Sequence, residues 1–214
     1  PVIKRPAESE RRIHGFYRGA GPGSFLHSLL EWRAQAGFEL PPEQQQAFLD
    51  MLEKRSAARG WQAWARPLAN WTGDLVQREL TLPIQPDGSQ PRVALGKLNQ
   101  AIPELEFWFA SSQVSSRQLD ALVTEHTLRD LPGLENTPRP AADNMTLNGM
   151  LKGFIDLVFE HEGRYYVADY KSNCIGPTDE DYTPEAMARV VREKRYDLQY
   201  ALYLLALHRL LKSR

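Results

Sequence analysis

Residues Leu151 to Ser172 read LKGFIDLVFEHEGRYYVADYKS, two runs rich in β-branched and aromatic residues on either side of Glu162-Gly163. A two-residue connection that ends in glycine is typical of a β-hairpin. If Glu162 and Gly163 form the loop, counting outward along the two strands places Asp156 opposite Asp169. The stretch therefore predicts a hairpin that holds two carboxylates face to face, with Cβ atoms about 4.5–5.5 Å apart.

The opposed carboxylates and a nearby lysine form a candidate catalytic site. Alternation along a strand puts Lys171 on the face of Asp169 and turns Tyr170 to the other face. Like charges that face each other destabilise a sheet, so a cation is expected between Asp156 and Asp169. Oxygen ligands suit Mg²⁺ better than Zn²⁺, and a metal-activated water beside an ammonium suits a phosphate substrate. The alternative is a half-exposed hairpin with ordinary surface charges.

Three segments and one further tyrosine carry a family resemblance. They are Gly153-Phe154-Ile155-Asp156, Asp169-Tyr170-Lys171-Ser172-Asn173, Tyr196-Asp197-Leu198-Gln199-Tyr200 and Tyr203. Together they resemble the RecB-type nuclease domains of the PD-(D/E)XK nuclease superfamily. The resemblance is dense from Met150 to about Leu211 and thinner before that. An acid, an acid-x-Lys and a Gln-x-x-x-Tyr element are specific in combination, although each is weak alone.

The resemblance implies a fold and an activity. The implied fold is α/β, a restriction-endonuclease-like mixed sheet flanked by helices, with a helical N-terminal part. The implied activity is Mg²⁺-dependent hydrolysis of single- and double-stranded DNA within an ATP-driven helicase–nuclease for double-strand-break repair and recombination. Mn²⁺ is expected to substitute for Mg²⁺, and Ca²⁺ to bind and inhibit. The implied partners are the helicase part of the same parent chain and RecC- and RecD-like subunits, in the bacterial cytoplasm.

The resemblance also implies roles for individual residues. Lys171 would orient the attacking water or stabilise the pentacovalent phosphate, and Gln199 and Tyr203 would position the DNA strand. A histidine in the segment GPGSFLH matches a metal-ligating histidine of the family; without the resemblance it would read as structural or exposed. The implied metal ligands are His27, Asp156, Asp169 and the backbone carbonyl of Tyr170.

An accessory acid is expected on an earlier strand. Glu104-Leu105-Glu106-Phe107-Trp108-Phe109 has the composition of a strand, and its two glutamates share a face. The resemblance implies an acid at the start of such a strand, which Glu104 matches best, with Glu106 as the runner-up. The alternative is a solvent-facing strand edge.

The remaining segments predict helices and loops. Ser24 is expected to cap a first helix, Thr183 is expected to cap one long final helix, and the helices between them are expected at residues 43–59, 61–77 and 115–128. The tryptophans of residues 61–77 recur at helical spacing, which is more typical of core packing than of base stacking. A basic cluster in the final helix would either meet phosphates or balance nearby glutamates. That cluster consists of Arg189, Arg192, Lys194 and Arg195.

Composition limits the function classes. The chain has 214 residues and a net charge of −1, so nucleic-acid binding would need a local basic patch. Its one cysteine excludes an internal disulfide, and no run of 18 apolar residues predicts a membrane span. The Gly-x-x-x-x-Gly-Lys-Ser/Thr pattern is absent from the sequence, so no P-loop ATP site is expected in this segment.

The expected domain organisation is an arm followed by a nuclease domain. Residues 1–23 read as a linker or N-terminal arm, and residues 24–214 as the RecB-like domain without its last strand and helix. The absence of an initiator methionine predicts a piece of a longer protein. Two other functions compete: a non-catalytic nuclease-fold module that grips DNA or a subunit, and a PD-(D/E)XK nuclease of another pathway, such as phage or CRISPR adaptation. The presence of Asp156, Asp169 and Lys171 favours an enzyme.

Overall fold

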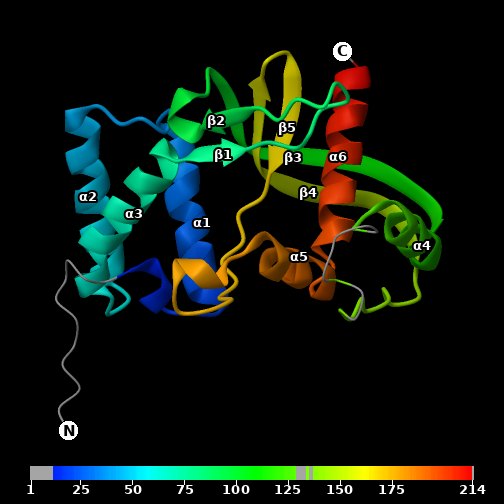
Figure 1. Cartoon of the computed structure of the whole chain (residues 1–214), viewed down its shortest axis with the longest axis horizontal. Helices are drawn as coiled ribbons and strands as arrows, with labels where there is room; N and C mark the ends of the chain where they lie inside the picture. Colours follow the sequence, from blue (N-terminus) through cyan, green and yellow to red (C-terminus); the bar gives the residue numbers. More distant parts are fainter. Residues whose placement is uncertain (1–11, 129–133, 135–136, 214) are drawn as a thin grey trace, which may run out of the picture. The chain divides into compact units, whose positions relative to one another are not determined.

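The structure, a computed structural model, describes residues 12–128, 134 and 137–213. The chain divides into two units, and each contains segments that are distant in the sequence (Figure 1). Unit 1 comprises Pro1–Pro103, Val158–Tyr166 and Tyr170–Cys174, and unit 2 comprises Glu104–Leu157, Val167–Asp169 and Ile175–Arg214.

Unit 1 consists mainly of helices with one small sheet. Its α-helices are α1 (Ala20–Gln35), α2 (Pro42–Ala57) and α3 (Ala65–Gln77), and its short 3-10 helices are η2 (Ile13–Gly15), η3 (Gln62–Trp64) and η4 (Leu95–Lys97). Strand β1 (Glu79–Thr81) pairs antiparallel with β2 (Arg92–Ala94), with Leu80 opposite Val93. The predicted helices at 43–59 and 61–77 are therefore present, the second of them as η3 followed by α3.

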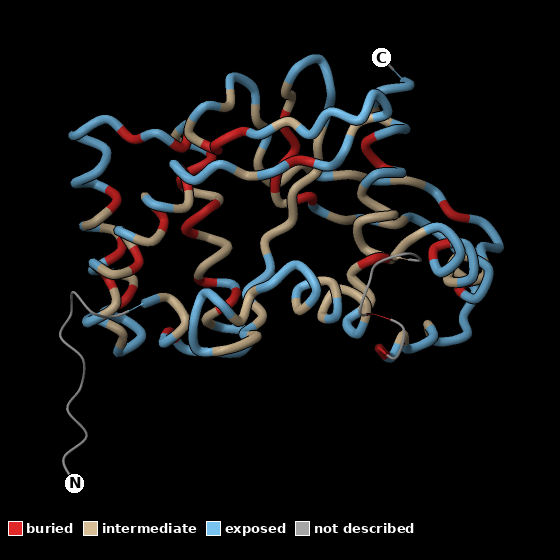
Figure 2. The backbone as a smooth tube through the Cα atoms, viewed as in Figure 1, coloured by how far each residue is buried: buried red, intermediate tan, exposed pale blue. Residues whose placement is uncertain are grey.

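The core of unit 1 is aromatic. The ring of Phe16 meets Trp61 edge-on at 5.4 Å and Trp64 at 5.2 Å between centroids. These tryptophans and Trp71 pack against the buried cluster, which confirms that the stripe is core. Buried and exposed residues alternate along the helical backbone (Figure 2). The cluster consists of Phe16, Phe25, Leu29, Leu40, Phe48, Leu52, Ala65 and Leu68.

The first helix begins earlier than the sequence indicated. Helix α1 begins at Ala20 with Gly19 as its N-cap at φ 107°, so the prediction of Ser24 as the cap is wrong. Pro22 lies in the first turn, where its missing N–H is not needed for a helical hydrogen bond. Phe16 is also buried, at 5% exposed, and residues 12–23 belong to unit 1. Residues 1–11 lie outside the described residues.

A three-stranded sheet and three helices account for most of the remaining chain. The sheet has the order β3–β4–β5, formed by β3 (Gln100–Ser115), β4 (Thr146–His161) and β5 (Arg164–Ala168). The helices of unit 2 are α4 (Ser116–His126), α5 (Pro184–Glu193) and α6 (Tyr196–Lys212), with the 3-10 helix η5 (Asp179–Asp181) before α5. This α/β arrangement agrees with the predicted restriction-endonuclease-like fold class.

The predicted hairpin loop is present. Strand β4 ends at His161 and β5 begins at Arg164, and the two residues between them have φ values of 51° and 76°. Left-handed values at both positions are those of a type I′ turn, which matches the twist of the flanking strands. Strand β5 ends at Ala168, so Asp169 lies one residue beyond the strand. Its pairing opposite Asp156 stays a prediction.

The predicted long final helix is wrong, because the structure divides it into α5 and α6. Thr183 caps α5 as predicted, its hydroxyl accepting from the backbone N–H of Ala186 at 3.2 Å. The helix then breaks at Arg195, whose φ of 57° is left-handed. The Arg195 guanidinium pairs with Asp120 and Asp197, and these contacts hold the break.

Membrane-spanning helices are not found within the described ranges. Each helix there is too short or too polar to cross a bilayer.

Candidate functional site

A hydrogen-bonded group in unit 2 contains three of the predicted residues. The Nε2 of Gln199 donates to Asp169 Oδ1 at 3.1 Å and to Tyr203 Oη at 2.6 Å. Gln199 and Tyr203 lie one turn apart on α6, so they share a face as the sequence predicted. An amide nitrogen has two N–H groups, and here both are used to join the carboxylate to the phenol.

The pKa of Tyr203 shows which charged groups lie near its hydroxyl. Burial raises the pKa of Tyr203, a hydrogen bond from Gln199 acts against this, and the charges of Asp169, Asp156 and Glu104 raise it further. The three predicted acids of unit 2 are therefore close enough to act on one hydroxyl group. At neutral pH the hydroxyl stays protonated, so Tyr203 can accept from Gln199 and still donate to another acceptor.

The structure separates the two candidates for the accessory acid. Glu106 pairs with Lys152 Nζ at 2.7 Å and accepts from the indole of Trp108 at 2.6 Å, so its carboxylate is engaged elsewhere. Glu104 acts on Tyr203 instead, and its φ of 49° interrupts the regular strand geometry of β3. Glu104 as the accessory acid stays a prediction.

In unit 1, helix α1 runs beside the segment that contains the predicted lysine. A Cβ atom on Gly23 would lie 2.8 Å from the hydroxyl of Ser172, so a glycine permits this close approach. One turn later, the ring of His27 meets the ring of Tyr170 edge-on at 6.1 Å between centroids. Gly23 and His27 therefore share the face of α1 that lies along residues 170–172. Lys171 in that segment is exposed.

The comparisons with known proteins identify the family. The model of the PD-(D/E)XK nuclease superfamily matches residues 11–214. The chain belongs to the PD-(D/E)XK nuclease superfamily. It is thus a nuclease domain, of an enzyme class that hydrolyses phosphodiester bonds.

Curated relatives also align over nearly the whole chain. The chain is 39% identical over 206 residues to RecBCD enzyme subunit RecB of Escherichia coli, covering 94% of this chain and 16% of that protein. The RecB subunit of Haemophilus influenzae is 34% identical over 208 residues, with 96% and 15% covered. The RecB subunit of Mycobacterium tuberculosis is 31% identical over 222 residues, with 92% and 19% covered. These alignments confirm the resemblance to RecB-type nuclease domains, and the chain spans less than a fifth of those relatives.

PD-(D/E)XK nucleases generally use divalent metal ions. Within the part of the chain that the structure describes, no three His, Cys, Asp or Glu side chains converge closely enough to bind a metal ion as they stand. The donor chemistry of the site nevertheless fits a hard cation, because the acids acting on Tyr203 are carboxylates and their oxygens are the ligands that Mg²⁺ prefers. A bound cation would also relieve the repulsion among these carboxylates.

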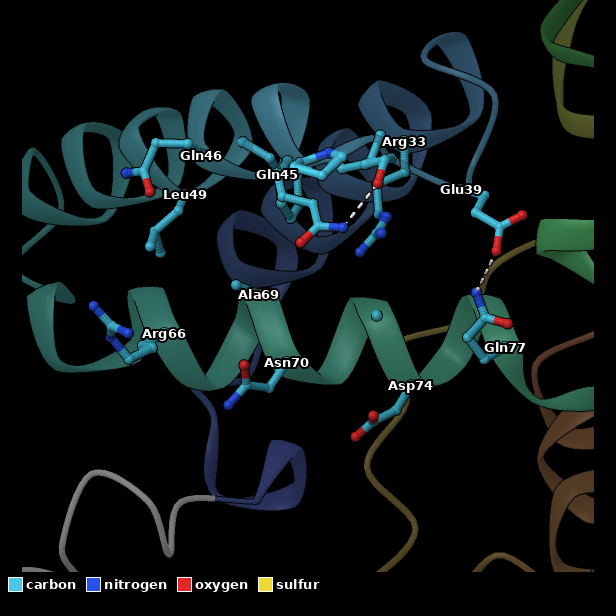
Figure 3. Close-up of a pocket in the computed structure, with 14 residues that line it drawn as sticks. Arg33, Glu39, Gln45, Gln46, Leu49, Arg66, Ala69, Asn70, Asp74 and Gln77 are labelled. Carbon is cyan, nitrogen blue, oxygen red and sulfur yellow. Dashed lines mark hydrogen bonds between the residues drawn. The ribbon is translucent and has the colours of Figure 1, made fainter.

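A pocket of about 850 Å³ in unit 1 contains none of the predicted site residues. It lies among the end of α1, α2 and α3, and polar side chains line much of it (Figure 3). The buried guanidinium of Arg33 faces it and donates to the carbonyl of Phe38 at 3.3 Å and to Thr72 at 3.1 Å. These hydrogen bonds connect the end of α1 to α3, which gives Arg33 a structural role.

The sequence did not reveal the residues that fix the start of α6. Asp197 is fully buried and pairs with both Arg139 and Arg195, and Arg195 also pairs with Asp120. Although burial acts against it, hydrogen bonds from Arg195 and Arg139 lower the pKa of Asp197. The only sequence signal was that Asp197 lies in a segment that carries the family resemblance.

Two residues of the basic cluster, expected either to meet phosphates or to balance nearby glutamates, are engaged within unit 2. Arg195 is held by Asp120 and Asp197, and Arg192 donates to the carbonyl of Leu134 at 2.7 Å. Arg192 and Arg195 thus have structural contacts, although these contacts are not with the nearby glutamates.

Proposed function

We propose that this chain is the nuclease domain of a RecB-type subunit and that it cleaves DNA with Mg²⁺. The observation that carries the proposal is the group formed by Gln199, Asp169 and Tyr203, on whose hydroxyl Asp156 and Glu104 also act. This arrangement places a positioning amide and a protonated phenol beside carboxylates, in a chain whose relatives are RecB subunits of the RecBCD enzyme.

The proposed metal ligands are the carboxylates of Asp156 and Asp169, the imidazole of His27 and the backbone carbonyl of Tyr170. A bound divalent ion supplies a polarised water as nucleophile and neutralises phosphate charge. Mg²⁺ is the proposed ion because the donors are mainly oxygen atoms. Mn²⁺ would substitute for it, and Ca²⁺ would bind and inhibit.

The side chains of the domain have distinct proposed tasks. Lys171 faces the charge that develops on the phosphate or orients the attacking water. Gln199 holds the carboxylate of Asp169 and the hydroxyl of Tyr203 in fixed positions. Tyr203, kept protonated by its raised pKa, donates a hydrogen bond to a phosphate oxygen of the strand. Glu104 adds a negative charge that strengthens binding of the cation.

The proposed setting is a larger complex. By analogy with the relatives, the domain would act on single- and double-stranded DNA beside the helicase part of its parent chain and RecC- and RecD-like subunits. The complex would take part in double-strand-break repair and recombination in the bacterial cytoplasm.

A metal titration with paired substrates tests this proposal. The chain is incubated with linear and with circular single-stranded DNA of equal length, in EDTA and in rising concentrations of Mg²⁺. Cleavage should be absent in EDTA, should saturate with Mg²⁺ and should be lost in Asp169→Asn. Cleavage of circular DNA reports an endonuclease, and cleavage of linear DNA alone reports an exonuclease.

A matched control separates loss of chemistry from loss of fold. Asp50→Asn changes an exposed carboxylate on α2 that accepts a hydrogen bond from Gln46, outside the proposed site, so it should cleave like the wild type. DNA binding without cleavage at every Mg²⁺ concentration would refute the nuclease proposal and favour the non-catalytic module.

A further inference from the structure

An exposed pair of aromatic rings in unit 2 is held in place by a lysine and a glutamate. The ammonium of Lys152 lies 4.5 Å from the ring centroid of Trp108 and 5.1 Å from that of Phe154. Glu106 Oε1 pairs with Lys152 Nζ at 2.7 Å and accepts from the Trp108 indole N–H at 2.6 Å. These four residues, two from β3 and two from β4, form what we name the aromatic platform.

The rings of the platform are both exposed and oriented. Trp108 is 56% exposed and Phe154 is 43% exposed. The hydrogen bond to Glu106 fixes the indole, and the shared lysine restrains both rings. Rigid aromatic surfaces bind a partner with little loss of conformational entropy. Core packing does not explain these exposed rings, because aromatic rings that stabilise a fold are usually buried.

The platform lies on the same face of β4 as a predicted catalytic acid. Alternation along the strand places Lys152, Phe154 and Asp156 on one face. At about 3.3 Å per residue, Phe154 is roughly 7 Å from Asp156 along the strand and Lys152 roughly 13 Å.

The other face of β4 is already covered. Ile155 is fully buried, at 0% exposed. A Cβ atom on Gly153 would lie 2.3 Å from the ring of Phe107. Lys152 and Phe154 of the platform are exposed, so a ligand can reach the face of β4 that carries them.

We propose that unpaired bases of the DNA strand stack on Trp108 and Phe154 and hold the strand near Asp156. This inference rests on the proposed function, because Asp156 marks the site of cleavage only if the domain is a nuclease. The platform would recognise bases rather than phosphates, since Glu106 neutralises Lys152. Every base has a π face, so the platform would accept any sequence in single-stranded form and exclude paired bases.

Tryptophan fluorescence provides a direct test. All five tryptophans lie in the described ranges, and Trp108 alone among them is exposed. The chain is titrated in EDTA with oligo(dT), with a duplex of the same length and with an abasic oligonucleotide that has the same number of phosphates. Oligo(dT) should quench Trp108 fluorescence, and the duplex and the abasic strand should not.

Variants measure what the platform contributes to binding. Trp108→Ala and Phe154→Ala should each weaken the Kd for labelled oligo(dT), followed by anisotropy, by about tenfold, within the range for loss of one stacked base. The abasic strand should bind both variants as it binds wild type. Leu122→Ala, which truncates an equally exposed residue (56%) on α4, should bind oligo(dT) like wild type.

The outcomes separate this inference from the proposed function. With Mg²⁺, the platform variants should show a raised KM for single-stranded DNA and an unchanged kcat. Wild-type affinity for oligo(dT) in both platform variants would overturn the inference, as would equal quenching by the abasic strand. Quenching and tenfold weakening in EDTA, combined with no cleavage by wild type in Mg²⁺, would support the platform and refute the nuclease proposal.

Discussion

Replacing Asp197 with asparagine removes the negative charge between two buried arginines. The Asp197 side chain is 0% exposed, and those of Arg139 and Arg195 are 10% and 11% exposed. Among the described residues, Asp197 is the only carboxylate that pairs with Arg139, whereas Arg195 keeps Asp120. The variant therefore leaves one buried guanidinium without a counter-charge.

The expected decrease in the free energy of unfolding follows from which charges stay paired. Removing one partner of a buried ion pair costs about 3–5 kcal/mol, because the other charge stays buried. Asp120 still neutralises Arg195, so we expect the lower end of that range, about 3 kcal/mol. For a chain of this size, a decrease of about 3 kcal/mol in the free energy of unfolding lowers Tm by roughly 6–12 °C.

The pH dependence gives a second signature of the same interaction. The pKa of Asp197 is lowered in the folded state, so its contribution is present above the unfolded pKa, near 3.9, and is lost as pH falls through the folded value. The difference in Tm between wild type and Asp197→Asn should therefore be full at pH 7 and shrink below about pH 4.

Thermal melts and urea denaturation of the wild type and Asp197→Asn in EDTA measure the effect. The control is Asp50→Asn, which replaces an exposed residue and should change the free energy of unfolding by less than about 0.5 kcal/mol. A decrease of less than about 1 kcal/mol in the free energy of unfolding of Asp197→Asn would refute the argument that Asp197 neutralises a buried arginine. A difference that persists undiminished at pH 3 would refute the assignment to the carboxylate.

Three further outcomes concern the site. Lys171→Ala should lower cleavage by orders of magnitude and leave the Mg²⁺ affinity, measured by calorimetry, within a few-fold; near-normal cleavage would remove Lys171 from the mechanism. His27→Ala should weaken Mg²⁺ affinity, measured by calorimetry at one pH, because it removes one proposed ligand; an unchanged affinity would show that His27 is not a ligand. Gly153→Ala should destabilise the chain by about 1–3 kcal/mol and reduce cleavage, because the new methyl group meets the ring of Phe107, which packs on Tyr203. Wild-type Tm and activity in Gly153→Ala would show that the ring moves without cost.

Local chemistry explains what could be predicted of the fold. The two-residue hairpin loop follows from a glycine at a position that needs positive φ, and the cap of α5 follows from a threonine before a proline. The pair formed by Gln199 and Tyr203 follows from helical spacing. Each of these signals involves residues within four positions of one another.

Two features that the sequence did not predict depend on residues far apart in the sequence. The break at Arg195 depends on Asp120, 75 residues away, and the burial of Asp197 depends on Arg139, 58 residues away. A helical pattern that runs through Arg195 contains no local reason to stop, because the left-handed residue is stabilised by tertiary ion pairs.

By itself, the sequence determined the superfamily, the hairpin with its acid-x-Lys segment, and the residues that carry the proposed chemistry. The tertiary structure gives Glu104 and Glu106 different surroundings, because an ion pair with Lys152 across the strands engages Glu106 while the charge of Glu104 acts on Tyr203. It also decided where the final helix divides and which aromatic rings stay exposed. Strand alternation alone predicts the same face for the two glutamates, whereas the φ of 49° at Glu104 and the charges and rings brought near each of them by folding make them different.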